Sequence, residues 1–215
     1  DLNLCYVGIE LPSGDEMGMF RKGPALFGES LVALDLHTGK RKWHFQMVHH
    51  GLWDRDVPCA AIPCDIPVNG KLVKALAQPS KQCFLYVLNR ETGEPIWPIE
   101  ERPVPAGDVP AEWYSPTQPF PTKPPAYSVQ GVSPDQIIDF TPDLHAQGLK
   151  LIANYRYGGL YEPPSLSTAE GTWGTLMVPH ETGGTNWPGG SYDPDTHIVY
   201  VYSKNEGVLV GLSPV

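Results

Sequence analysis

The chain has 215 residues, enough for one large globular domain, and 41% of them are hydrophobic while 18% are charged. Its net charge of −9 argues against a nucleic-acid partner, because phosphate binding needs clusters of Lys and Arg. The 22 glycines and 24 prolines favour turns and ordered loops over a helical bundle, and no apolar run is long enough to span a membrane.

A partial repeat organises the chain. The sequence ALDLHTGKRKW, residues 33–43, returns as VLNRETGEPIW, residues 87–97, and more weakly as SYDPDTHIVYV, residues 191–201. Each copy has an apolar strand, Asp or Asn, a turn and a second strand, and the Gly of the first two copies suits a hairpin turn with positive φ. A period of about 40 to 55 residues predicts propeller blades, with the trailing Trp43 and Trp97 between neighbouring blades.

Polar side chains are concentrated directly after the first copy, in HHGLWDRD, His49 to Asp56. In an extended segment Asp54 and Asp56 share one face, and two carboxylates repel each other unless a cation lies between them. One of them could accept the proton of a substrate hydroxyl. Alternatively, Asp54 caps a turn or pairs with Arg55, and Asp56 is a solvated loop charge. Adjacent histidines in a strand face opposite sides, so we do not expect His49 and His50 to share a metal ion.

The four cysteines show no paired zinc spacing. A disulfide between Cys59 and Cys64 and two buried thiols are both open alternatives.

A proline-rich segment, residues 100–134, interrupts the repeat and excludes a regular helix or a central strand. Its aromatic residues predict an ordered excursion packed on the propeller rather than a free linker. Residues 133–155 carry the one predicted helix, with Thr141 or Asp143 as its cap and Pro142 in its first turn. We expect this excursion to cover the rim of the propeller.

The pattern A-x-D-x-x-T-G-x-x-x-W resembles the tryptophan-docking motif of the pyrroloquinoline quinone-dependent alcohol and glucose dehydrogenases. The stretches WHFQMVHHGLWDRDVP, TKPPAY, IDFTPDL and GGTNWPGGSYDP resemble the same family, closest to its glucose dehydrogenase-like group. The resemblance implies an all-β fold, a partial β-propeller of about four blades out of eight with a proline-rich insertion and one short helix. We expect blades at 1–99, the insertion and helix at 100–160, and further blade strands at 161–215. Such a part needs its missing propeller half or an oligomer partner.

The resemblance also implies roles for particular residues. Asp54 stands where the family has its general base, and Asp54 with Asp56 would bind Ca²⁺ or a lanthanide. Lys81 would contact the quinone oxygens and polarise the reacting carbonyl, and Asn186 and Trp187 of GGTNWPGG would hold the quinone. The alternatives are a solvated Lys81 and an ordinary turn with a buried Trp.

One departure from the family concerns the metal. Leu11 or Pro12 stands near the place of the family's calcium-binding Asn, which leaves Glu10 or Asp15 as substitutes.

The implied function is part of a quinoprotein dehydrogenase that oxidises an alcohol or sugar by hydride transfer to pyrroloquinoline quinone. Electrons would pass to ubiquinone or cytochrome c, in the periplasm or at the periplasmic face of the inner membrane. The isolated chain is expected to be inactive if it needs its missing half. The alternative is a non-catalytic propeller scaffold or binding protein, which has no use for the set Asp54, Lys81, Asn186 and Trp187.

Overall fold

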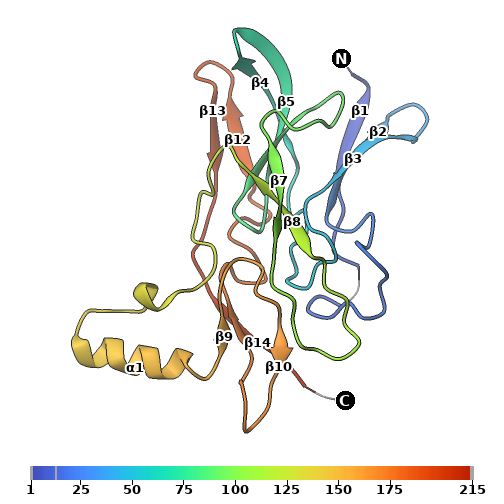
Figure 1. Ribbon diagram of the computed structural model, residues 1–215. Coiled ribbons are helices and arrows are strands. Elements are labelled where there is room, and N and C mark those ends of the chain that lie inside the picture. Colours follow the sequence, from blue (N-terminus) through green and yellow to red (C-terminus); the bar gives the residue numbers. More distant parts are fainter. Residues whose placement is uncertain (1, 13, 214–215) are drawn as a thin grey trace.

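The computed structural model describes residues 2–12 and 14–213 and consists mainly of strands joined by long loops (Figure 1). The strands of this part of the chain form five separate sheets of two to four strands, and no sheet closes on itself. Within the same residues, no helix has the length and apolar character that crossing a bilayer requires. The predicted all-β class is confirmed.

Two three-stranded antiparallel sheets correspond to the first two copies of the repeat. In each sheet the strands pair in sequence order, so that each is a simple up-and-down meander. The first sheet contains β1 (Leu4–Gly8), β2 (Ser30–Asp35) and β3 (Arg41–Gln46). The second contains β4 (Ile62–Val68), β5 (Lys71–Pro79) and β6 (Leu85–Asn89).

The same turn closes all three copies of the repeat. A side-chain oxygen of Asp35, Asn89 or Asp193 accepts hydrogen bonds from the backbone N–H groups two and three residues later, at 2.8 to 3.5 Å. The first two turns have glycine at a φ of +67° and +78°, which glycine adopts without strain. The third copy, between β12 (Gly190–Asp193) and β13 (Ile198–Val201), has His197 there at +57°.

The trailing tryptophan of the first copy lies against the turn of the second. Trp43 is buried, and a Cβ added at Gly93 would come within 2.6 Å of its ring, so glycine lets the ring stack on the backbone. Trp97 packs against the core of the second sheet, where Tyr192 and Val199 of the third copy also pack. The predicted place of Trp43 between two units is confirmed.

The proline-rich segment forms a hairpin of two edge strands, β7 (Ile99–Pro103) and β8 (Thr117–Pro121). Prolines are tolerated there because an edge strand leaves half of its N–H groups outside the ladder.

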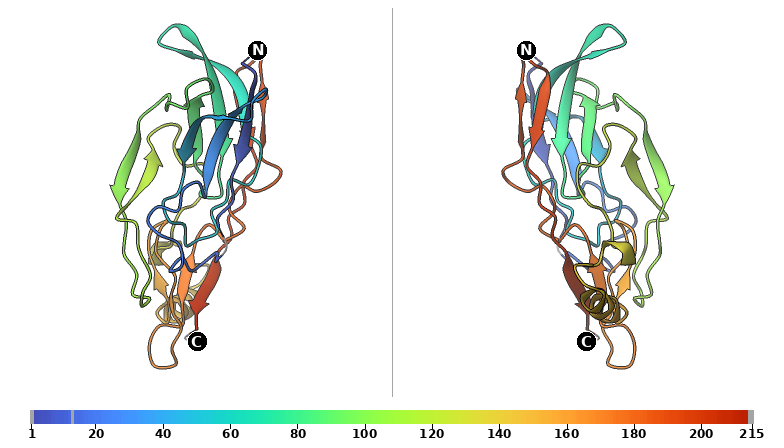
Figure 2. Two further views of the ribbon diagram at one scale, coloured as in Figure 1. Left: turned by 90° about the vertical axis from the view of Figure 1, so that its right-hand side faces the viewer. Right: turned by 90° about the vertical axis from the view of Figure 1, so that its left-hand side faces the viewer.

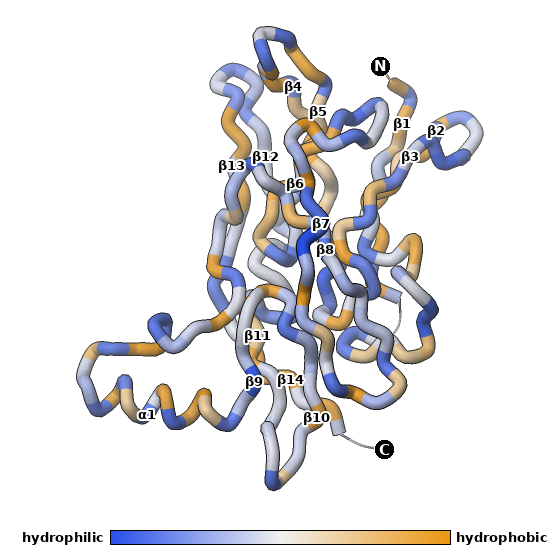
Figure 3. The backbone as a smooth tube through the Cα atoms, in the orientation of Figure 1, coloured by the Kyte–Doolittle hydropathy of each residue, from blue (hydrophilic) through white to orange (hydrophobic). Residues whose placement is uncertain are grey.

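A short 3₁₀ helix, η1 (Pro134–Gln136), then leads to α1 (Pro142–Ile152). Thr141 is the N-cap, since its Oγ1 accepts the N–H of Leu144 at 3.2 Å. Ile152 is the one buried residue of α1, while Leu144 and Leu151 are exposed. Figure 3 shows that α1 carries both hydrophobic and hydrophilic residues, and Figures 1 and 2 place it at the opposite end of the molecule from the β4–β5 hairpin.

The last sheet has the strand order β10–β14–β11–β9. It combines parallel and antiparallel pairs of four short strands, β9 (Arg156–Tyr157), β10 (Ser165–Leu166), β11 (Thr175–Met177) and β14 (Val208–Leu212). Because β9 pairs with β11, this sheet runs across residue 160, and the three-part division of the chain stays a prediction.

The cysteines are free thiols. Cys64 lies buried in β4 and Cys59 is half-buried in the loop before it, so the structure has the thiol alternative and not the loop disulfide.

Candidate active site

Three side chains singled out in the sequence meet at one place. The Lys81 ammonium Nζ lies 3.0 Å from Asp54 Oδ1 and 2.9 Å from Asp56 Oδ2. Lys81 is only 5% exposed, so it is not the solvated lysine of the alternative interpretation. Asp54 and Asp56 therefore share one face, and the cation between them is the lysine itself.

The loop that carries the two aspartates is fixed from both sides. Before it, Trp53 is buried, donates its indole N–H to the carbonyl of Glu162 at 2.8 Å and packs edge-on against Tyr161. Asp54 has a φ of +50°, a conformation that costs a residue other than Gly some free energy. After it, Asp56 Oδ1 accepts the backbone N–H of Leu11 at 2.6 Å.

The two carboxyl groups have pKa values shifted in opposite directions. Burial is the main reason that the pKa of Asp54 is raised to about 7; hydrogen bonding with Asp56 adds to the rise and Lys81 opposes it. Burial acts on Asp56 as well, but the hydrogen bonds from Leu11 and Lys81 outweigh it and lower the pKa of Asp56. The pair thus contains one firmly ionised carboxylate and one that exchanges a proton near neutral pH.

The glycine-rich segment of GGTNWPGG packs on Lys81. A Cβ at Gly183 would lie 2.4 Å from Lys81 Cγ, and the N–H of Gly184 donates to the Lys81 carbonyl at 3.0 Å. The Asn186 side chain is engaged within its own turn, donating to the carbonyl of Thr182 at 2.6 Å and accepting the N–H of Trp187 at 2.8 Å.

Trp187 is 87% exposed, so the alternative of a turn with a buried tryptophan does not apply. Its large flat ring, on the segment whose Gly183 packs on Lys81, is free to stack on a planar, aromatic group.

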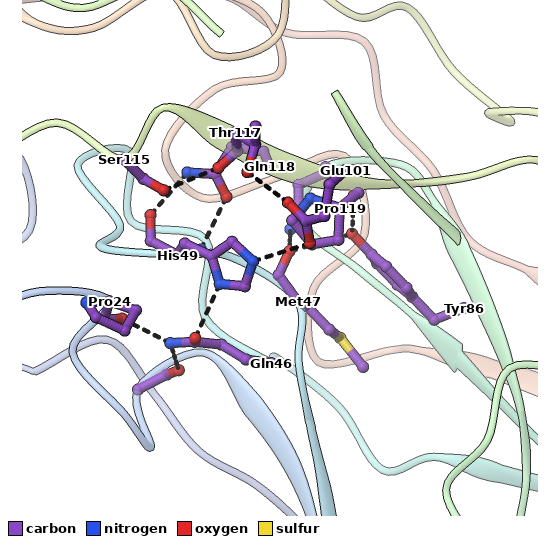
Figure 4. A network of polar contacts seen from close by, with 12 residues as sticks. Pro24, Gln46, Met47, His49, Tyr86, Glu101, Ser115, Thr117, Gln118 and Pro119 are labelled. Atoms are coloured by element: carbon purple, nitrogen blue, oxygen red, sulfur yellow. Dashed lines mark hydrogen bonds and ion pairs between the residues drawn. The ribbon is translucent and has the colours of Figure 1, made fainter. Parts of the chain in front are cut away.

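The histidines contact different partners, as their alternation predicts. His49 joins β3 and the β7–β8 hairpin: its Nδ1 lies 2.9 Å from Gln46 Oε1 and its Nε2 3.0 Å from Glu101 Oε1 (Figure 4). Its backbone N–H and C=O both bond to the side-chain amide of Gln118, at 2.8 and 2.7 Å.

His50 is buried, and its two ring nitrogens lie 2.7 Å from the carbonyl oxygen of Gly23 and 2.9 Å from Glu112 Oε1. The other Glu112 oxygen accepts the N–H of Gly18 at 2.6 Å, and Trp113 packs edge-on against the His50 ring. His50 therefore ties the proline-rich segment and the loop before β2 to the loop of Asp54.

The predicted metal site is incomplete. Asp54 and Asp56 already hold Lys81, and Glu10 and Asp15, the possible substitutes, are exposed. Within residues 2–12 and 14–213, no three His, Cys, Asp or Glu side chains gather closely enough to hold a metal ion. The residues present do not fit a metal by themselves, and metal binding by Asp54 and Asp56 stays a prediction.

Two buried charged residues beside the site have functions that the sequence did not indicate. Glu29 is 1% exposed, and its carboxylate accepts the backbone N–H of Arg55. Arg55 does not pair with Asp54: its guanidinium donates to the carbonyls of His180 and Pro179 at 2.6 and 2.7 Å. Glu29 lies outside the motifs quoted from the sequence, and Arg55 was considered only as a possible partner of Asp54.

Comparison with known proteins gives consistent similarities. The family model for the β-propeller domain of PQQ glucose/ethanol/alcohol dehydrogenases matches residues 1–214. The chain is 33% identical over 215 residues to a probable quinate dehydrogenase (quinone) of Xanthomonas campestris pv. juglandis, covering 99% of this chain and 26% of that protein. It is 34% identical over 210 residues to the quinoprotein glucose dehydrogenase of Escherichia coli (strain K12), covering 92% and 24%. The chain thus spans about a quarter of the length of these curated relatives.

Solved structures agree on the fold. The quinohemoprotein alcohol dehydrogenase from Comamonas testosteroni superposes with a TM-score of 0.58 at 24% identity, over 96% of this chain and 24% of that one. A europium-containing methanol dehydrogenase gives a TM-score of 0.58 at 22% identity, over 94% and 28%.

Proposed function

The chain belongs to the family of PQQ glucose/ethanol/alcohol dehydrogenase β-propeller domains, and from this premise we propose that it is part of an enzyme that oxidises an alcohol or a sugar. The family expected from the Thr-Gly turns and trailing tryptophans is confirmed, and so is the partial propeller. Pyrroloquinoline quinone, when bound, supplies the acceptor for the substrate's hydride.

The observation that carries the proposal is the contact of Lys81 with both aspartates at 3.0 and 2.9 Å. Alcohol oxidation removes the hydroxyl proton, and Asp54, whose pKa is raised to about 7, is a general base suited to neutral pH. Asp56 stays ionised beside it and keeps Lys81 in place.

Lys81 has a second task in this proposal. Its ammonium is buried beside Asp54, and it would stabilise a carbonyl oxygen of the quinone that gains negative charge. The two carboxylates on Lys81 offset the cost of burying its charge.

Asn186 and Trp187 would form the quinone's remaining contacts on this chain. The exposed Trp187 ring offers a flat apolar surface, and the turn that carries it packs on Lys81 through Gly183. The glycines permit this approach because a side chain there would collide with the lysine stem.

A scaffold propeller needs the Thr-Gly turns and the tryptophans, but it has no need for a buried lysine between two carboxylates. The cost of burying these charges therefore favours the enzyme over the non-catalytic alternative.

The wider assignments are part of the same proposal. The substrate is an alcohol or sugar, the electron acceptor is ubiquinone or cytochrome c, and the place of reaction is the periplasm or the periplasmic face of the inner membrane. Relatives named probable quinate dehydrogenase (quinone) and quinoprotein glucose dehydrogenase are in keeping with an alcohol or sugar as the substrate.

The test replaces Asp54 with Asn in the full-length protein, supplied with pyrroloquinoline quinone and Ca²⁺ or a lanthanide. We expect dye-linked alcohol or sugar oxidation to fall at least about 100-fold, since a general base contributes that much, while a quinone titration gives nearly unchanged affinity. The exposed Asp195→Asn variant is the matched control. Normal turnover by Asp54→Asn would show that Asp54 is not the base.

A further inference from the structure

Arg55 stands between the two aspartates of the site and points away from them. Its neighbours Asp54 and Asp56 reach Lys81, whereas the Arg55 side chain is 1% exposed and enters the protein interior. There Nη1 donates to the carbonyl of His180 at 2.6 Å and Nη2 to that of Pro179 at 2.7 Å. One guanidinium thus holds two consecutive carbonyls more than 120 residues away along the chain.

The carbonyls that Arg55 holds belong to the segment that leads to Asn186. The His180 carbonyl also accepts the N–H of Gly183 at 2.7 Å, which begins the turn. Gly183 then packs on Lys81, and Asn186 closes the turn through its bond to Thr182 at 2.6 Å. The hydrogen bonds of Arg55 therefore fix this turn at the end that contacts Lys81.

The main chain of Arg55 is held from the other side by Glu29. The Arg55 N–H donates to the Glu29 carboxylate. Glu29 is 1% exposed and lies directly against Gly51, where an added Cβ would be 1.9 Å from Oε2. Asp54, whose backbone is left-handed with a φ of +50°, lies in the sequence between Gly51 and Arg55, the two residues that contact Glu29. A strained residue keeps such a conformation only where its surroundings impose it.

The choice of arginine matters for this geometry. The planar guanidinium presents two parallel N–H groups to two adjacent acceptors, which a lysine ammonium, with one nitrogen, matches poorly. Burying a guanidinium on backbone carbonyls is costly, and a methionine of similar length would fill the same space without the cost.

We infer that Arg55 is a positioning residue: it fixes the distance between the Asp54–Lys81 pair and the turn of Asn186 and Trp187. This inference rests on the proposed function, in which the pair handles the substrate's proton and the turn holds the quinone. Arg55 touches neither substrate nor cofactor and acts through the two segments that it joins.

The test compares Arg55→Lys and Arg55→Met with the wild-type full-length protein, and with Arg102→Lys as the matched control, because Arg102 is half-exposed and pairs with Glu100. We expect Arg55→Met to weaken quinone binding and to lower kcat at saturating quinone by about tenfold or more, with little change in KM for the alcohol, because displaced catalytic groups slow the chemical step. Arg55→Lys should recover part of both losses.

A second measurement does not depend on activity. In the quinone-free protein, amide hydrogen exchange of residues 178–189 should become faster in both Arg55 variants and stay unchanged in Arg102→Lys, since the His180 carbonyl loses its fixed partner.

Failures of the two ideas are distinguishable. If the wild-type protein binds no quinone, the proposed function is overturned. If it binds and turns over normally, but folded Arg55 variants match it in quinone affinity and kcat, or exchange at 178–189 is unaltered, the positioning role of Arg55 is overturned. Should Arg55→Met fail to fold, Arg55→Lys alone decides by the same two readouts.

Discussion

Replacing Glu29 with Gln should make the protein's stability less dependent on pH. Burial is the main cause that raises the pKa of the Glu29 carboxyl from 4.5 to about 8, and the negative Asp56 adds to it. In the unfolded chain the same carboxyl ionises near 4.5, whereas the folded chain keeps the proton up to about 8. The stability that this group contributes is therefore complete below pH 4.5, and it is lost as the pH rises from 4.5 to about 8.

The size of the effect follows from the shift. Each pH unit between the two pKa values costs the wild-type protein about 1.4 kcal/mol, because one unit of pKa difference corresponds to about that energy. Between pH 5.5 and pH 8 the loss adds up to roughly 3 kcal/mol. A glutamine keeps an acceptor oxygen for the N–H of Arg55 but cannot ionise, so the variant escapes this loss.

The assay is denaturant unfolding of wild-type and Glu29→Gln protein at several pH values, followed by the fluorescence of the buried Trp43 and Trp53. The difference in unfolding free energy should shift in favour of the variant by roughly 3 kcal/mol from pH 5.5 to pH 8. The exposed Glu94→Gln is the control and should follow the wild type. Parallel pH curves for Glu29→Gln and wild type would refute the reasoning, since they would mean that Glu29 ionises alike in both states.

Three further predictions concern local contacts. Gly93→Ala should lower the unfolding free energy by roughly 2 kcal/mol more than Gly70→Ala. Both glycines have a similar positive φ, but of the two new Cβ atoms the one at Gly93 meets a tryptophan ring. Equal losses of stability in thermal unfolding would contradict that contact. Thr141→Ala should cost about 1 kcal/mol, confined to α1 and measured by hydrogen exchange of that helix. Glu112→Gln should speed exchange of residues 104–116, because the charged partner of His50 is lost; unaltered exchange there would argue against the link.

The parts of the fold that depend on local sequence were predictable. The Asp or Asn at the start of each turn accepts hydrogen bonds from residues two and three positions later, so a short run of consecutive residues determines the turn. Asp54 and Asp56 both contact Lys81, as expected for two residues that are separated by one position and face the same side of a segment. Thr141 and Pro142 likewise marked the start of α1.

Contacts between distant segments could not be predicted. Glu112 lies 62 residues from His50 and 94 from Gly18, and nothing near it in sequence indicates either partner. Arg55 is similar: a charged residue between two aspartates indicated a local ion pair, but tertiary packing turned it toward carbonyls on another segment. Lys81 is a further example, because it comes from the next repeat unit and lies between the two aspartates, where the sequence predicted a metal cation; metal binding there stays a prediction.

The stacking of Trp43 on Gly93 has a consequence for how the molecule comes apart. The first unit contributes the Trp43 ring and the second unit contributes the turn on which that ring packs, so these two sheets share one hydrophobic boundary. Loosening the turn of Gly93 uncovers Trp43, which belongs to the first sheet. The first two sheets should therefore unfold together, and a substitution in the turn of Gly93 should first destabilise the sheet that precedes this turn.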